Sequence, residues 1–228
     1  MLDKIKIIFT IIQMMITVTM VIISIYIFKS KSRKIRTVWS KFQIKWLGIE
    51  LDIKGSQDLE ANMLLMNHQS LLDIIVMESL HPANLAWVAK KEIGDIPWFG
   101  HILKAPDMIM VQRESKSSLV KLIKDVKEKL DDNRTIAIFP EGTRTNGKKM
   151  KKFKAGSKII AEKFNLKVQP IVLVRTRDIL DTQNMRQRSG KVTIVYLPTV
   201  VADKKTTWYQ DTEEKMNMIL KRELENDI

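Results

Sequence analysis

An uncharged apolar segment near the start of the chain constrains the fold more than any other feature of the sequence. Residues 7–28 contain no Asp, Glu, Lys or Arg. As an α-helix this segment is roughly 33 Å long, which is enough to cross the hydrocarbon core of a bilayer. It is too long for the core of a signal peptide, and no small-residue cleavage site follows it. We therefore expect a membrane helix, and the alternative is a buried core helix.

Basic residues are distributed unevenly on the two sides of this segment. Lys4 and Lys6 precede it, and five basic residues follow it between positions 29 and 36. The positive-inside rule then predicts attachment to the cell (inner) membrane, with the rest of the chain facing the cytoplasm. Both a full span of the bilayer and insertion into a single leaflet fit this pattern.

Residues 34–47 are predicted to form a second, amphipathic helix. One face is apolar and the other is basic or polar. The apolar face consists of Ile35, Val38, Trp39, Phe42 and Trp46. Such a helix is typical of a membrane interface, with its tryptophans at headgroup level, and the alternative is a helix packed on the rest of the protein. Residues 1–48 are thus expected to anchor the chain to a membrane.

From residue 49 onward, short apolar runs alternate with helical patterns. Ile49, Leu51 and Ile53 alternate with charged residues, which indicates a half-buried strand. Further strands are expected at residues 63–66, 85–89, 107–111, 135–139, 168–174 and 192–197, and helices around residues 119–130, 155–164 and 216–224. This alternation predicts one α/β layered domain over residues 49–228, with a central, largely parallel or mixed sheet flanked by helices.

A first motif, residues 67–73 (NHQSLLD), lies between an apolar run typical of a strand and one typical of a helix. Ser70 is a suitable N-cap, so His68 should lie in the loop and Asp73 in the first helical turn. In that arrangement the two side chains can meet. A carboxylate on one ring nitrogen fixes the tautomer and leaves the other nitrogen as a base. The structural alternative is a capping box between Asp73 and Ser70.

A second motif, residues 139–144 (FPEGTR), follows another buried strand. Proline ends the strand, and Gly142 permits a tight turn of the backbone. The guanidinium of Arg144 suits a phosphate, which it can bind with two parallel hydrogen bonds. The alternative is a surface salt bridge between Glu141 and Arg144.

Together the two motifs resemble those of the glycerolipid acyltransferases with an HxxxxD motif, and most of all the 1-acyl-sn-glycerol-3-phosphate (lysophosphatidic acid) acyltransferase branch. Two further blocks are similar, residues 89–92 (AKKE) and 168–171 (VQPI). The resemblance covers about residues 49–200, and a membrane-attached N-terminus is usual in this family.

The resemblance implies transfer of a fatty acyl group from acyl-CoA or acyl carrier protein to the sn-2 hydroxyl of lysophosphatidic acid. The product would be phosphatidic acid, in phospholipid biosynthesis. His68 would be the general base and Asp73 would orient it. Backbone N–H groups of residues 70–72 are candidates for holding the oxyanion. No metal or cofactor is expected besides the acyl donor as co-substrate.

The expected phosphate site combines basic residues with the loop that carries one of them. Its members are Arg144, Arg113, Lys90, Glu141, Gly142 and Thr143. The family often has an acidic residue before the arginine at position 113, whereas this chain has Gln112. That change removes a charge that could position Arg113.

Composition bears on which partners and functions are possible, and two alternatives to the function above remain open. The net charge of +13 favours anionic partners such as membrane lipids, and the absence of cysteine excludes a cysteine nucleophile. One alternative is an acyltransferase for another acceptor, either glycerol-3-phosphate or another lysolipid. The other is a non-enzymatic, basic membrane-binding protein. No nucleic-acid partner is expected, because the sequence contains no recognisable nucleic-acid-binding module.

Overall fold

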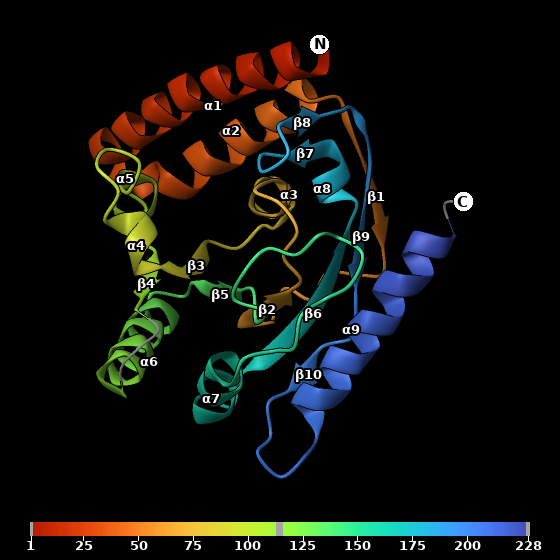
Figure 1. Cartoon of the computed structure of the whole chain (residues 1–228). Coiled ribbons are helices and arrows are strands. Elements are labelled where there is room, and N and C mark those ends of the chain that lie inside the picture. The colour runs from red at the N-terminus through yellow and green to blue at the C-terminus, as the bar shows by residue number, and fades with distance from the viewer. Residues whose placement is uncertain (1, 113–115, 227–228) are drawn as a thin grey trace.

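The chain folds into a central sheet with helices on both faces (Figure 1). The computed structural model describes residues 2–112 and 116–226. Its helices are α1 (Leu2–Ile27), the 3-10 helix η1 (Lys29–Lys31), α2 (Ser32–Trp46), α3 (Leu72–Leu80), α4 (Lys91–Gly94), α5 (His101–Lys104), α6 (Lys116–Asp131), α7 (Ala155–Lys163), α8 (Thr176–Ile179) and α9 (Trp208–Glu225). Its strands are β1 (Ile49–Lys54), β2 (Met63–Met66), β3 (Leu85–Lys90), β4 (Ile109–Val111), β5 (Thr135–Ile138), β6 (Lys167–Val174), β7 (Leu180–Asp181), β8 (Arg186–Gln187), β9 (Gly190–Tyr196) and β10 (Val200–Val201).

The main sheet has eight strands, and seven of them follow the order β1-β9-β6-β2-β5-β3-β4. Strands β6, β2, β5, β3 and β4 are parallel to their neighbours in this series, whereas β9 is antiparallel to β6 and β10 pairs with β6 in the same way. The prediction of a largely parallel or mixed sheet is therefore confirmed. Because the parallel strands end at the same edge, the loops that follow them meet there.

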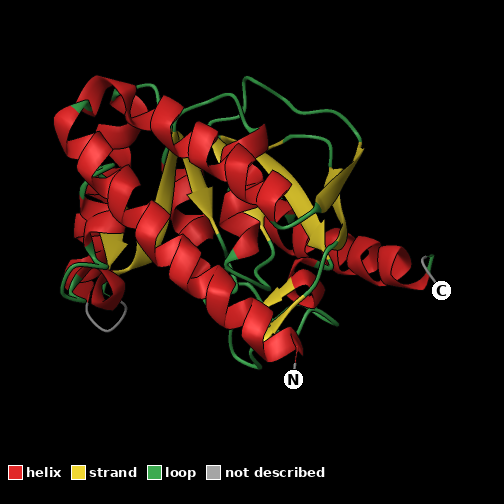
Figure 2. Ribbon diagram, turned by 90° about the horizontal axis from the view of Figure 1, so that it is seen from above, coloured by secondary structure: helices red, strands yellow, loops and turns green. Residues whose placement is uncertain are grey.

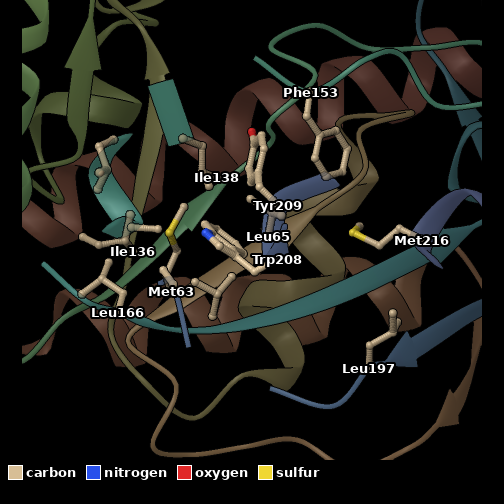
Figure 3. Packing of buried hydrophobic residues seen from close by; sticks show 14 of the residues in the cluster. Met63, Leu65, Ile136, Ile138, Phe153, Leu166, Leu197, Trp208, Tyr209 and Met216 are labelled. Carbon is tan, nitrogen blue, oxygen red and sulfur yellow. The ribbon is translucent and has the colours of Figure 1, made fainter. Parts of the chain in front are cut away.

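Strand β2 explains how the sheet is covered on both faces. Met63 and Leu65 point into one hydrophobic cluster, with residues of α6, α7 and α9, and Figure 3 shows them near Trp208. Leu64 and Met66 point into a second cluster, with residues of α1 and α3. All four side chains are fully buried, as expected for a central strand of a layered α/β sheet.

The longer elements agree with the sequence patterns, and the shorter ones were not predicted. Every strand expected from residue 49 onward is present, within one or two residues at most ends. Helices α4, α5 and α8 and strands β7, β8 and β10 are two to four residues long. Elements of this length show no measurable periodicity, so the sequence gives no signal for them.

Helices α1 and α2 form a hairpin, here called the anchor hairpin, that lies across one end of the layered domain (Figures 1 and 2). Residues 6–27 of α1 have a mean hydropathy of 2.3, and the helix is long enough to cross a membrane. One face of α1 is buried through Ile7, Met14, Val18 and Ile22, while the opposite face leaves its large apolar side chains exposed. Its inner face thus lies against the protein along most of the helix.

Helix α2 packs on α3 with its polar face inward. Arg36, Ser40 and Gln43 are buried, and Arg36 pairs with Glu78 of α3. Phe42 and Trp46 remain 44% and 47% exposed. This orientation is the reverse of that of a surface helix of a water-soluble protein. The helix therefore packs on the domain through its polar face, while Ile35 and Trp39 pack against α1 and the rest of its apolar face is exposed.

Candidate active site

Both sequence motifs lie at the edge of the sheet where the parallel strands end. His68 follows β2, and Phe139 follows the adjacent strand β5. On the other side of β2, strand β6 ends at Val174, just before α8. Residues from three neighbouring strands therefore converge around His68, as expected for a site in a parallel sheet.

His68 and Asp73 form a hydrogen bond at the start of α3. The distance from His68 Nδ1 to Asp73 Oδ2 is 2.7 Å, and Asp73 is fully buried whereas His68 is partly exposed. Since a carboxylate accepts hydrogen bonds, Nδ1 carries the proton and Nε2 keeps its lone pair. The pair has the geometry of a histidine base and its orienting carboxylate.

Asp73 also satisfies the structural alternative. Its Oδ2 accepts hydrogen bonds from the backbone N–H groups of Gln69 (2.7 Å) and Ser70 (2.9 Å). Ser70 Oγ in turn accepts from Leu72 N–H at 3.2 Å. These contacts are those of a capping box, although the helix begins at Leu72 and Leu71 is its N-cap residue. The same carboxylate thus caps the helix and holds the imidazole, so the two interpretations do not exclude each other.

The amide groups at the start of α3 are less available than the sequence suggested. The N–H of Ser70 is bonded to Asp73, and the N–H of Leu72 is bonded to Ser70 Oγ. The Ser70 hydroxyl is buried and donates to Leu180 O at 2.5 Å. Two of the three candidate amides for an oxyanion are therefore already used within the protein.

The second motif and the residue that follows it, Thr145, hold the backbone of His68 from both sides. Glu141 Oε1 accepts from His68 N–H at 2.8 Å, and Thr145 N–H donates to His68 O at 2.8 Å. The turn between them is possible because Gly142 has φ +69°, a left-handed conformation that glycine adopts without strain. Two motifs more than seventy residues apart therefore form one rigid unit around the imidazole.

Glu141 supports this loop from inside the protein. It is only 1% exposed, and its second oxygen, Oε2, accepts from Lys151 N–H at 2.6 Å. Burial raises the pKa of Glu141 to about 7, although the two backbone N–H groups oppose the shift. The sequence grouped Glu141 with the phosphate site, but its oxygens face backbone amides. No ion pair joins Glu141 to Arg144 within residues 2–112 and 116–226.

Phe139 forms one wall of the site. Its ring stacks on the imidazole of His68, with ring centroids 3.9 Å apart and an angle of 11° between the planes. The ring also stacks on Trp87, with ring centroids 5.4 Å apart. Phe139 is one of the residues that line a cavity of about 300 Å³ between the sheet, α6 and α7, whose walls are mainly apolar and include Val88, Val111, Leu119 and Ile138. The cavity therefore lies beside the residue that stacks on His68, and it can accept an apolar chain.

Three of the expected phosphate ligands, Lys90, Thr143 and Arg144, lie where strand β3 ends or in the loop that follows strand β5. Arg144 and Thr143 are exposed, and Arg144 Nη1 approaches Thr182 Oγ1 at 3.4 Å. Lys90, at the end of β3, is exposed as well. Arg113 lies outside the described residues, whereas its neighbour Gln112 is exposed and lines the cavity. In the part of the chain that the structure describes, no group of three or more acidic or histidine side chains could hold a metal ion.

Sequence reasoning missed two threonines that contact His68 and Asp73. Thr145 follows the second motif directly, so an extension of the motif by one residue would have found it. Thr176 at the end of β6 is fully buried, and its hydroxyl donates to Asp73 Oδ1. It lies more than one hundred residues from Asp73, and nothing in its local sequence marks it.

Comparisons with known proteins agree with this arrangement. The family model named "Acyltransferase" matches residues 51–174. A 1-acyl-sn-glycerol-3-phosphate acyltransferase of Helicobacter pylori is 46% identical over 171 residues, which are 74% of this chain and 72% of that protein. A protein of the same name from Cocos nucifera is 31% identical over 75% of this chain and 54% of its own length. Among solved structures, the 1-acyl-sn-glycerophosphate acyltransferase PlsC of Thermotoga maritima matches with a TM-score of 0.67 and 26% identity, over 87% of this chain and 82% of that chain.

Proposed function

The chain belongs to the acyltransferase family, and on this premise we propose that it transfers a fatty acyl group to the sn-2 hydroxyl of lysophosphatidic acid, giving phosphatidic acid. The names of its relatives support the reaction. The observation that carries the proposal is the hydrogen bond between His68 Nδ1 and Asp73 Oδ2, in a loop whose backbone is held by Glu141 and Thr145.

The proposed reaction is a direct transfer between two substrates. His68 Nε2 removes the proton of the acceptor hydroxyl while its oxygen attacks the carbonyl carbon of the thioester. Asp73 stabilises the imidazolium that forms. The tetrahedral intermediate collapses with cleavage of the carbon–sulfur bond, and the imidazolium returns its proton to the thiolate that leaves. Ser70 takes no part as a nucleophile, because its hydroxyl is buried and bonded to a backbone carbonyl.

The phosphate of the acceptor is proposed to bind Arg144, together with Lys90 and Arg113. A phosphomonoester near neutral pH carries close to two negative charges, and a guanidinium matches its oxygens. The exposure of Arg144 and Lys90 suits a ligand that arrives from outside the protein. Glycerol-3-phosphate offers the same phosphate but has no acyl chain, so it would gain nothing from the anchor hairpin.

The acyl donor is proposed to place its chain in the apolar cavity beside Phe139. Lysines occupy positions 148, 149, 151, 152 and 154, and all five are exposed. Lys154 also lines the cavity. This basic loop suits an acyl donor whose carrier group is anionic. Coenzyme A carries phosphates and acyl carrier protein is acidic, so both donors meet this condition. Both donors belong in the assay.

The anchor hairpin is proposed to insert into one leaflet of the inner membrane from the cytoplasmic side. The inner face of α1 contacts the protein along most of the helix, so a perpendicular span would draw the layered domain into hydrocarbon. A single engineered cysteine near the N-terminus tests this in intact cells, because the chain has none of its own. Protection from an impermeant thiol reagent is expected, and labelling from outside would contradict one-leaflet insertion.

The acceptor profile of the purified protein tests the proposed reaction. Lysophosphatidic acid, glycerol-3-phosphate and lysophosphatidylcholine should be compared with each thioester donor. We expect a strong preference for lysophosphatidic acid. We also expect Arg144→Lys to raise the KM for this acceptor far more than the KM for the thioester, because lysine keeps the charge but loses the paired donors. Equal rates with lysophosphatidylcholine would refute the phosphate site, and a preference for glycerol-3-phosphate would reassign the acceptor.

A further inference from the structure

Thr176 stands at a sharp turn between β6 and α8. The residue before it, Arg175, has φ +66°, a left-handed conformation that is uncommon for a residue with a side chain. The turn brings the Thr176 hydroxyl to Asp73 Oδ1, where it donates a hydrogen bond. A contact to Gln69 Oε1 is longer, at 3.4 Å, and a hydroxyl has only one hydrogen to donate. The short contact therefore assigns this hydrogen to Asp73.

The two oxygens of Asp73 have different partners. Oδ2 accepts from His68 Nδ1 and from the N–H groups of Gln69 and Ser70, whereas the partner of Oδ1 is Thr176. Asp73 is fully buried, so solvent does not reach the carboxylate. Without the hydroxyl, the buried oxygen Oδ1 would lose its hydrogen-bond donor. The carboxylate would then rotate, so that its two oxygens share the three remaining donors, which are His68 Nδ1 and the N–H groups of Gln69 and Ser70. That rotation would move Oδ2 away from the imidazole.

We propose that Thr176 is a positioning residue for acyl transfer, whose hydroxyl fixes the rotation of the Asp73 carboxylate so that Oδ2 meets His68 Nδ1. This inference rests on the proposed function, in which His68 is the base, and it adds a third residue to the pair. Thr176 acts through Asp73, and it does not contact the reacting atoms.

The hydroxyl also affects the charge that develops during the reaction. By holding Oδ2 against Nδ1, it lets the carboxylate stabilise the positive charge of the protonated imidazole. If the hydroxyl is removed and Oδ2 turns away, this stabilisation weakens and the imidazole releases its proton at lower pH. The acid limb of the profile of kcat against pH should therefore move to lower pH.

A purely structural role for Thr176 makes different predictions. A separate hydrogen bond, from Ser70 Oγ to Leu180 O, joins the start of α3 to the segment just after α8. Loss of the Thr176 hydroxyl should therefore leave this connection in place. If the hydroxyl only held α8 on α3, its removal would lower stability without moving the pH profile.

The experiment compares three variants of the full-length chain in mixed micelles, with lysophosphatidic acid and an acyl-CoA donor. Thr176→Val keeps the shape and removes the hydroxyl, and Thr176→Ser keeps the hydroxyl. Thr193→Val is the matched control, because Thr193 is also buried and its hydroxyl is bonded to a carboxylate, Asp52, instead of Asp73. The charged groups near the pair, Glu141 and Arg177, are unchanged in every variant.

For Thr176→Val we expect kcat per folded molecule to fall about 10-fold to 100-fold, by analogy with the loss of a hydrogen-bond partner that orients a metal-binding side chain. The KM for each substrate should change little, and the acid limb should move to lower pH. Thr176→Ser should restore both properties, and Thr193→Val should match the wild type. If Thr176→Val fails to fold, Thr176→Ala takes its place.

Two outcomes would overturn the inference. One is a wild-type kcat and pH profile in Thr176→Val. The other is a loss of total activity that is fully explained by a smaller fraction of folded protein, with an unchanged kcat per folded molecule. His68→Ala separates this failure from failure of the proposed function. An inactive His68→Ala beside a normal Thr176→Val removes the role of Thr176 alone, whereas an active His68→Ala removes the base itself.

Discussion

Helix α3 carries a buried carboxylate at each end, and the two have different partners. At its start, Asp73 accepts from backbone N–H groups, a threonine hydroxyl and His68. In its last turns, Glu78 accepts from the guanidinium of Arg36 and from the indole N–H of Trp87. Burial raises the pKa of Glu78, although Arg36 opposes the shift.

The difference between the partners separates two tasks. The partner of Asp73 is an imidazole, a group that can act as a general base, so this end of the helix suits catalysis. The partner of Glu78 is a guanidinium, which stays charged, and it comes from the anchor hairpin. This second contact therefore fixes the position of α2 on the domain. One helix thus connects the proposed base with the proposed membrane anchor.

The largest expected effect is on the catalytic end. Asp73→Asn removes the carboxylate that fixes the His68 tautomer, and kcat should fall by a factor on the order of 10⁴ if the analogy with the serine-protease triad holds. His68→Ala should abolish transfer. Thermal unfolding of His68→Ala should stay close to that of the wild type, because His68 is partly exposed. A mild loss of activity in Asp73→Asn would mean that the capping role alone accounts for this residue.

The second prediction concerns the opposite end. Arg36→Met leaves Glu78 buried without its cation, and the free energy of unfolding should fall by about 3–5 kcal/mol. Urea unfolding in detergent measures this loss. The activity per folded molecule should change little. Combination with Glu78→Gln should restore most of the stability, since no uncompensated charge remains. Loss of activity without loss of stability would contradict the division of tasks.

Glu141 is a third buried carboxylate, which accepts from backbone N–H groups and forms no ion pair within the described part of the chain. Its pKa is raised from 4.5 to about 7, so the folded protein holds this proton more tightly than the unfolded chain does. Its contribution to stability is full below about pH 4.5 and is lost as the pH rises to about 7. The unfolding free energy of the wild type relative to Glu141→Gln should fall over this range, by about 3 kcal/mol at most. A difference that does not vary with pH would contradict the raised pKa.

The smallest effect is expected on the outer face of α2. Phe42→Ser removes an exposed apolar side chain, so the stability of the protein should change by less than about 0.5 kcal/mol. Binding to phosphatidylcholine vesicles should weaken roughly 10-fold or more, because the ring loses its apolar surroundings in the lipid. Vesicle flotation measures this effect. Lys41→Ser is the control on the same helix, and equal binding of both variants would contradict membrane contact by this face.

The sequence predicted the arrangement of the long elements because their periodicity is local. The apolar runs of β2 and β5 and the cap at Ser70 required no knowledge of distant residues. The meeting of His68 with Asp73 was predictable for the same reason, since five residues and one helix start determine it. The orientation of α2 was not, because its polar face is paired with Glu78 and Asn84, which lie far along the chain.

By itself, the sequence determined the strand–helix alternation, the apolar segment at residues 7–28 and the two motifs with their local geometry. Only the tertiary structure decided that Glu141 and Thr145 hold the backbone of His68 and that Thr176 bonds to Asp73. It also decided that α2 buries its polar face. The physical reason is the parallel sheet, which brings together the ends of strands that are separated by long crossover connections. Hydrogen bonds between such strand ends depend on the register of the sheet, which no local pattern contains.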